Sequence, residues 1–183
     1  DGHDGRGEVP LDPATSSDLA GFASRKWIRG LLADPMDERY FGRMRTPEGE
    51  PAHTRMSKLI SEIMPEGEEA RRSLLVDFDA IAAFLALESS RPILKQLPSP
   101  GLSSVVGRGM EVFMNVCNEC HSYDGERKGT TRAPEMRGYG SVEWIGLMIA
   151  EPDHESRYRD VGRERARMPR FKNKLSERER NMI

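Results

Sequence analysis

The feature that most constrains how this chain can fold is an internal repeat. Residues 18–35 (DLAGFASRKWIRGLLADP) align without a gap with residues 135–152 (EMRGYGSVEWIGLMIAEP), at an offset of 117 positions. Several aligned residues are identical or similar: Gly21 with Gly138, Phe22 with Tyr139, Ser24 with Ser141, Trp27 with Trp144, Ile28 with Ile145 and Pro35 with Pro152. A repeat of this kind in a chain of 183 residues predicts two copies of one small domain.

Each copy of the repeat is predicted to form a short helix. Ser24 and Ser141 are suited to cap its N-terminus, because a serine oxygen can accept a hydrogen bond from a free backbone N–H of the first turn. Pro35 and Pro152 are placed to end the helix. The apolar residues between them fall on one helical face: Trp27, Ile28, Leu31 and Leu32 in the first copy, and Trp144, Ile145, Met148 and Ile149 in the second.

Further helices are expected outside the repeat. One runs from Asp77 to Leu87, and another from about Val106 to Cys117. A capping box over Ser176–Glu179 opens a helix of which only the first turns precede Ile183. The Glu-rich segment 61–76 is expected to be solvated. These patterns together favour an all-α fold.

The boundary between the two domains is expected at residues 91–103 (RPILKQLPSPGLS), which are rich in Pro and Ser. We therefore predict a first domain over residues 1–90, a linker over 91–106 and a second domain over 107–183. Domains of this size have thin cores and often need a metal or a cofactor to be stable.

Composition excludes some classes of protein. No apolar run approaches the roughly 20 residues that a membrane-spanning helix needs. The formal net charge is −2, which argues against a dedicated nucleic-acid binder. No signal peptide is visible after Asp1.

The two cysteines form the most specific motif in the chain. Cys117 and Cys120 are three positions apart, and His121 follows directly. On a helical turn, two thiols at this spacing can add to the two vinyl groups of one haem, and the adjacent histidine can bind the iron, so the motif predicts covalent attachment of c-type haem. Two other interpretations of the motif are a redox-active cysteine pair and a structural zinc site. A redox-active pair is typical of a βαβ unit, whereas the flanks here are helical, and a structural zinc site needs four ligands. The other histidines form no paired motif: His3, His53 and His154.

A sixth ligand of the iron should be soft and should lie downstream of the motif. Met168 is the best candidate, since it lies in a polar loop bounded by Pro169, where burial alone explains a methionine poorly. A thioether opposite histidine stabilises ferrous iron and raises the reduction potential. Other methionines lie at helical or apolar-face positions and are expected in the core: Met110, Met114, Met136 and Met148.

With these motifs in place, residues 109–183 resemble a class I cytochrome c domain. The helix with Gly109 and Phe113 resembles the N-terminal helix of that family. Residues 133–138 resemble the segment beside its proximal histidine, Met168-Pro169 resembles its distal ligand loop, and the capping box at Ser176 opens what should be its C-terminal helix.

The resemblance implies roles for two further residues. The backbone carbonyl of Pro134 would accept the Nδ1 proton of His121, which orients the ring and raises its basicity. Trp144 would lie near a haem edge or a propionate; the alternative is a tryptophan that only packs in the core.

The first half resembles the same family without its haem motif. Met56 would be the distal ligand by position, although Ser57 follows it in place of proline. The simplest interpretation is a first domain that is incomplete at its N-terminus, with its Cys pair preceding Asp1; the alternative is a degenerate copy that never bound haem. The resemblance thus implies two tandem cytochrome c-like domains of short helices around haem. The paired architecture resembles diheme cytochromes attached to bc-type quinol-oxidising complexes.

The function implied is electron transfer through haem with His/Met axial ligation, in a respiratory chain, without substrate chemistry at the iron. Residues 157–174 hold eight Arg or Lys and two acids, a net charge of +6, which suits an acidic redox partner; a solvated loop without a partner is the alternative.

The resemblance also implies a location in the periplasm or on the outer face of the cytoplasmic membrane, with any membrane tether outside residues 1–183. A bc-type complex or a terminal oxidase is an expected partner. The alternative functions are a haem-relay subunit of an oxidoreductase, or a haem enzyme with an open iron site.

Overall fold

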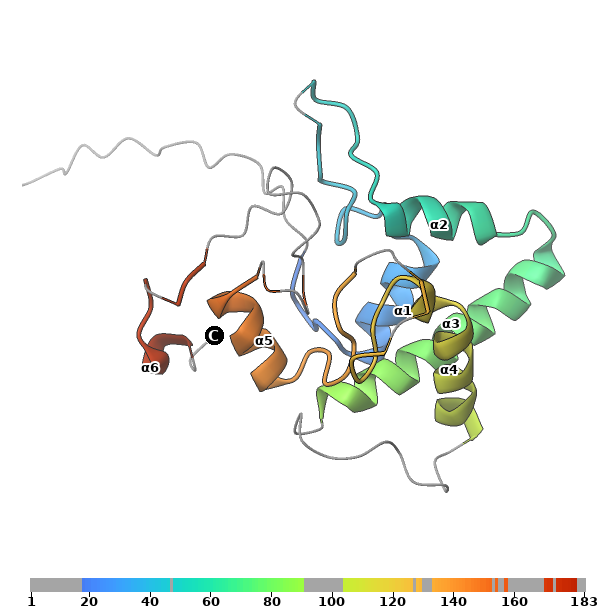
Figure 1. Cartoon of the computed structure of the whole chain (residues 1–183). Coiled ribbons are helices and arrows are strands. Elements are labelled where there is room, and N and C mark those ends of the chain that lie inside the picture. Colours follow the sequence, from blue (N-terminus) through green and yellow to red (C-terminus); the bar gives the residue numbers. More distant parts are fainter. Residues whose placement is uncertain are drawn as a thin grey trace, which may run out of the picture.

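Helices make up most of the backbone that the structure describes (Figure 1). They are α1 (Arg25–Ala33), α2 (Arg55–Ile63), α3 (Glu68–Ser89), α4 (Ser104–Asn115), the 3₁₀ turn η1 (Cys117–Glu119), α5 (Val142–Ala150) and α6 (Glu177–Arg180). The computed structural model describes residues 18–46, 48–90, 104–126, 128–129, 133–152, 154, 157, 170–172 and 174–180. Within these residues there are isolated β-bridges but no strand, so the all-α prediction is confirmed there. No helix in this part of the chain is long and apolar enough to cross a membrane.

The two helices of the repeat begin in the same way. The Oγ of Ser24 accepts a hydrogen bond from the backbone N–H of Trp27 at 3.2 Å, and the Oγ of Ser141 accepts one from Trp144 at 3.1 Å. The predicted N-caps are therefore confirmed. The predicted ends are confirmed too: α1 ends two residues before Pro35, and α5 ends two residues before Pro152.

The two tryptophans of the repeat also make equivalent hydrogen bonds. The indole Nε1 of Trp27 donates to the carbonyl of Asp18 at 3.0 Å, and that of Trp144 donates to the carbonyl of Glu135 at 2.9 Å. Each acceptor lies nine residues before its tryptophan. The repeat that the alignment identifies is thus also a repeat of local structure.

The prediction for residues 61–87 was incomplete. α2 occupies the start of the segment expected to be solvated, and α3 begins at Glu68, nine residues before the expected start at Asp77. The first turns of α3 are exposed up to Ser73 and therefore show no apolar periodicity. Glu68 and Glu69 instead stabilise the start of the helix through its dipole.

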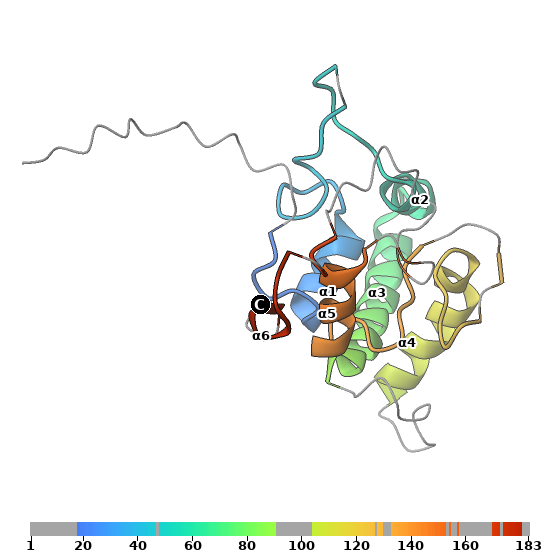
Figure 2. The same cartoon turned by 60° about the vertical axis from the view of Figure 1, so that its left-hand side comes forward.

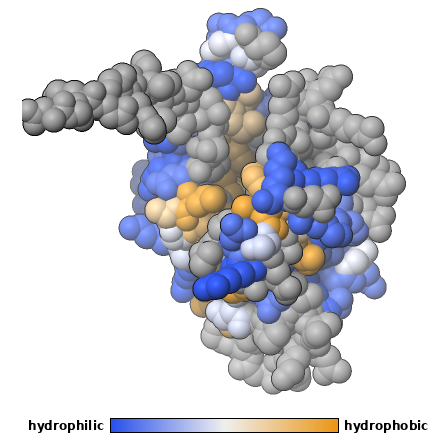
Figure 3. Space-filling model, turned by 90° about the vertical axis from the view of Figure 1, so that its left-hand side faces the viewer, coloured by the Kyte–Doolittle hydropathy of each residue, from blue (hydrophilic) through white to orange (hydrophobic). Residues whose placement is uncertain are grey.

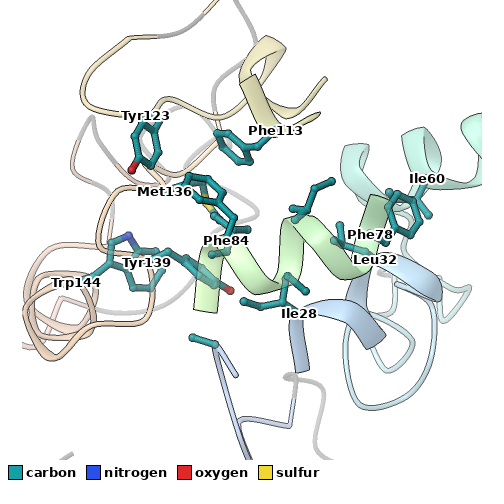
Figure 4. Close-up of a cluster of buried hydrophobic side chains, with 14 of the residues drawn as sticks. Ile28, Leu32, Ile60, Phe78, Phe84, Phe113, Tyr123, Met136, Tyr139 and Trp144 are labelled. Carbon is teal, nitrogen blue, oxygen red and sulfur yellow. The ribbon is translucent and has the colours of Figure 1, made fainter. Parts of the chain in front are cut away.

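The core is built around α3, which lies between α1 and α4 (Figures 1 and 2). Figure 4 shows α3 with Phe113 and Tyr123 on one side and Ile28 and Leu32 on another. A single buried cluster includes residues of both expected domains: Ala23, Ile28, Leu32, Ile60, Phe78, Ile81, Ala82, Phe84 and Leu85 from the first, and Phe113, Tyr123, Met136, Tyr139, Trp144 and Met148 from the second. Met136 and Met148 therefore lie in the core as expected, and Met110 and Met114 pack against it.

The surface around α5 is partly apolar. The side of the molecule on which α5 and α6 lie carries hydrophobic patches among hydrophilic groups (Figure 3). Val142 and Leu147 of α5 are exposed, whereas Trp144, Met148 and Ile149 are buried. α5 therefore has an apolar outer face as well as an apolar inner face.

Candidate functional site

The Cys-x-x-Cys-His motif lies on a tight turn that follows α4. Within it, the backbone N–H groups of Cys120 and His121 both donate to the carbonyl of Cys117, at 3.1 and 2.9 Å. Residues i and i+3 of a 3₁₀ turn eclipse each other, so this backbone brings Cys117 and Cys120 to the same side. Both thiols are half-buried and free of disulfide bonding. The turn therefore presents two thiols and an imidazole in one small region.

The imidazole of His121 is held by the loop that follows. Its Nδ1 lies 2.9 Å from the carbonyl oxygen of Pro134. Because a carbonyl oxygen can only accept, Nδ1 carries the proton and Nε2 keeps its lone pair. Burial lowers the pKa of His121, against the opposing effects of the Pro134 hydrogen bond and the charge of Glu135. The ring is thus neutral and has the tautomer that binds a metal ion through Nε2.

The contact between His121 and Pro134 is the one that the cytochrome resemblance implies, and it is present. Among the described residues, no hydrogen-bond partner occupies Nε2. The ligand role of His121 stays a prediction; a neutral ring whose Nδ1 is held in this way has the donor chemistry that iron binds through Nε2.

The Cys117 thiol differs from the thiols of a redox-active pair. Burial raises the pKa of the Cys117 thiol to about 12, and the neighbouring Cys120 adds to this effect. Redox-active cysteines have lowered pKa values because their thiolate is stabilised. In the part of the chain that the structure describes, no three His, Cys, Asp or Glu side chains are grouped as metal ligands. Neither the redox pair nor the zinc site gains support from the structure.

The sequence analysis missed Asn118, which lies inside the motif and is 2% exposed. Its Nδ2 donates to the carbonyls of His121 and Glu126 at 3.2 and 3.1 Å, and its Oδ1 accepts from the backbone N–H of Lys128 at 3.1 Å. The side chain therefore ties the haem-motif turn to the next loop. No signal in the sequence separates this asparagine from an exposed one.

A second missed residue, Glu135, closes the same loop. Its carboxylate accepts hydrogen bonds from the backbone N–H groups of Asp124 and Gly125, both at 3.0 Å. Asp124 and Gly125 have φ values of 57° and 79°, in the left-handed region that an Asp-Gly turn favours. The Asp-Gly pair predicts the turn, but not the carboxylate that binds it.

Trp144 lies in the core. Its ring centroid is 5.0 Å from that of Tyr139, and its Nε1 is engaged by the carbonyl of Glu135. This placement matches the alternative interpretation given above, a packing tryptophan. Proximity to a haem edge stays a prediction.

The ligand roles of the two methionines stay predictions. Met168 lies outside the described residues, as does His3. Met56 lies in the first turn of α2, is half-buried and packs against the core. His53 and His154 are exposed, as expected for His53.

The basic segment 157–174 is described only in part. Arg157 departs from the expectation of an exposed basic surface, because it is 7% exposed and donates to the carbonyl of Glu151 at 3.1 Å, where it satisfies the end of α5. Lys172 forms an ion pair with the Glu151 carboxylate at 2.6 Å. Arg170 is exposed, while residues 158–169 lie outside the described residues.

Comparison of the chain with protein-family models, with curated proteins and with solved structures gives no match. A functional assignment therefore depends on the motif, its local geometry and the internal repeat.

Proposed function

We propose that this chain is a c-type cytochrome that carries one haem, bound through thioether bonds to Cys117 and Cys120 with His121 as an axial ligand. The haem supplies one-electron chemistry when bound, so the chain transfers single electrons. Met168 is proposed as the opposite ligand and Met56 as its counterpart in the first repeat.

The observation that carries the proposal is the state of His121. The carbonyl of Pro134 fixes its Nδ1 proton at 2.9 Å, which leaves Nε2 as a lone-pair donor beside two free thiols on an eclipsed turn. A buried histidine needs a partner for its ring N–H in any case, so this hydrogen bond supports the proposal through its combination with the two adjacent thiols. The raised pKa of Cys117 does not favour disulfide exchange, which uses a stabilised thiolate.

The wider assignment extends this proposal. The repeat supports the proposal that the chain belongs to the class I cytochromes c, with two tandem domains as in diheme cytochromes, and acts in a respiratory chain. Proposed partners are redox proteins with acidic docking surfaces, such as a bc-type complex or a terminal oxidase. The proposed location is the periplasm or the outer face of the cytoplasmic membrane.

Covalent haem content tests the proposal. The chain should be produced with a bacterial c-haem maturation system, and haem should be measured after denaturation by in-gel peroxidase staining and by the pyridine haemochrome spectrum. We expect one covalently bound haem per chain, and none in a Cys117→Ser/Cys120→Ser variant. His53→Ala is the matched control, since His53 is exposed and should leave haem content unchanged. A wild-type chain without haem would overturn the proposal.

The axial ligand is tested separately. Met168→Ala should abolish the long-wavelength sulfur-to-iron charge-transfer band of the oxidised protein, and Met56→Ala should leave it in place. A band that survives Met168→Ala would exclude Met168 as the ligand while leaving the haem assignment intact.

A further inference from the structure

The helix that packs most closely on the haem-motif helix comes from the other half of the chain. Gly109 of α4 is buried against α3, and a Cβ at this position would overlap the backbone carbonyl of Ala80. The two helix backbones therefore touch at a position where no side chain fits. At the edge of this contact, Arg108 donates to the carboxylate of Asp77 at 2.6 Å.

An aromatic cluster continues this contact toward the haem-motif loop. Phe84 of α3 lies 5.7 Å from Phe113 of α4 and 5.5 Å from Tyr123, measured between ring centroids. Phe113 and Tyr123 are 6.0 Å apart. All three rings are buried and face one another (Figure 4). Tyr123 lies two residues after His121, so α3 packs directly against the segment that carries the motif.

The same helix ends in a buried acid that binds this segment. Glu88 of α3 is 2% exposed. Its Oε1 accepts a hydrogen bond from the Tyr123 hydroxyl at 3.0 Å, and its Oε2 accepts one from the backbone N–H of Gly138 at 3.1 Å. Tyr123 and Gly138 flank the stretch that contains Pro134. One carboxyl group thus holds both ends of the loop that orients His121.

We propose that Glu88 is a positioning residue of the haem site, which acts across the repeat boundary through Tyr123, Gly138 and the carbonyl of Pro134. In this arrangement α3 of the first repeat closes the haem unit of the second. The inference rests on the proposed haem function. According to this proposal, the orientation and tautomer of His121 depend on α3, a helix from the preceding half of the chain.

The placement of α6 is consistent with this inference. The resemblance assigns the helix opened at Ser176 to the end of the second domain, yet α6 lies on the far side of α5 from α4 in both views (Figures 1 and 2). The face of α4 that contains Gly109 is occupied by α3.

Three variants of the full chain test the inference. Glu88→Leu removes both hydrogen bonds, Glu88→Gln keeps an acceptor for Gly138 and a polar partner for Tyr123, and Asp79→Asn is the control. Asp79 lies on the same helix but pairs with Arg25 and Arg29 of the first repeat. In the haem-free chain, NMR should report exchange of the Gly138 amide and the tautomer of His121.

For Glu88→Leu we expect Gly138 amide exchange to accelerate about tenfold, because its hydrogen bond is lost. We also expect the neutral His121 ring to lose its preference for the tautomer that carries the proton on Nδ1. In the haem-loaded protein, a weaker bond to Pro134 makes His121 less basic, so the ferrous-to-ferric ratio at a fixed redox poise should rise about threefold. Glu88→Gln should restore all three readouts, and Asp79→Asn should change none of them.

Equal effects of Glu88→Leu and Asp79→Asn would overturn the inference, and so would an unchanged His121 tautomer. If Glu88→Leu fails to fold, Tyr123→Phe removes one of the two hydrogen bonds without emptying the core and should shift the redox ratio in the same direction. A wild-type chain that binds no haem would defeat the proposed function instead, while the measurements on the haem-free chain would still decide whether Glu88 positions His121.

Discussion

The two copies of the repeat have nearly the same backbone and different surroundings. Ser24 and Ser141 have the same φ of −68°, with ψ values of 154° and 160°, and each caps its helix. Ser24 is nevertheless exposed, whereas Ser141 is 2% exposed. The difference teaches that the repeat motif specifies a local fold, while burial and function depend on what the rest of the chain places against it.

The outer faces of the two repeat helices differ in the same sense. α1 exposes basic side chains, and Arg25 and Arg29 form ion pairs with Asp79 of α3. α5 exposes Val142 and Leu147 instead. The two helices therefore share a fold but not a surface, and only the second is followed by the basic segment.

The largest effect should come from the core that both copies share. Phe84 is completely buried and contacts Phe113 and Tyr123, so Phe84→Ala should destabilise the chain by about 3–5 kcal/mol. Because α3 packs on both α1 and α4, we expect the unfolding midpoints of both repeats to fall. Urea unfolding followed by fluorescence of Trp27 alone and of Trp144 alone, each with the other replaced by Phe, measures this.

Leu59→Ala on α2 is the control for Phe84→Ala. Leu59 is an exposed leucine, so its truncation should cost less than about 1 kcal/mol. If Phe84→Ala lowered the midpoint seen by Trp144 and left that of Trp27 unchanged, the two repeats would be independent domains, and the shared core would not couple them.

A smaller effect is expected where the two copies touch. Ala23 and Gly140 occupy the same repeat position with φ values of 59° and 76°, and a Cβ on Gly140 would overlap the Cβ of Ala23. Gly140→Ala should therefore destabilise the chain by about 1–3 kcal/mol. Ala23→Gly frees the space and relieves a left-handed alanine, so the double variant should recover much of the loss. A double-mutant cycle of unfolding free energies measures the coupling.

Gly21→Ala separates backbone strain from this overlap. Gly21 has a φ of 71°, but a Cβ there meets no atom closer than 3.5 Å. Gly21→Ala should lower the free energy of unfolding by about 1 kcal/mol, because alanine disfavours a left-handed φ. Ala23→Gly should not reduce this loss. Strict additivity of Gly140→Ala and Ala23→Gly would show that the two turns do not touch in solution.

The sequence predicted the features that depend on near neighbours. The serine caps, the proline ends and the apolar face of α1 and α5 each require residues within one or two turns, so a short pattern contains the necessary information. The start of α3 was not predicted, because the side chains of its first turns face water. A helix segment that is exposed all round has no apolar periodicity in its sequence.

The supports of the candidate site could not be predicted in this way. Glu88 lies 50 residues before Gly138, and a glutamate near the end of a helix is usually exposed. Asn118 acts through three backbone groups that the local sequence does not identify. The contact of His121 with Pro134 could be predicted only from the resemblance to a family, because no sequence periodicity relates two residues that are 13 positions apart.

The smallest effect concerns a position just after the repeat, where the first copy has Asp37 and the second has His154. Arg39 donates from Nε and Nη2 to the Asp37 carboxylate at 2.9 and 3.1 Å, and its backbone N–H donates to the same carboxylate at 2.9 Å. The side-chain hydrogen bonds, followed by the backbone one, lower the pKa of Asp37 to about 2. A lowered pKa stabilises the fold above the ordinary Asp range, and this stabilisation is lost as the pH falls toward 2. Because the pair is partly exposed, Asp37→Asn should remove less than about 1 kcal/mol of acid-sensitive stability. Urea midpoints at about pH 5 and about pH 2.5 should therefore differ less in Asp37→Asn than in the wild type. Arg39→Gln should reproduce the part of the effect that comes from the side-chain pair, because the backbone N–H of residue 39 still donates to Asp37. It should add nothing to Asp37→Asn in the double variant. An equal pH dependence in the wild type and in both single variants would show that the pair contributes nothing in solution.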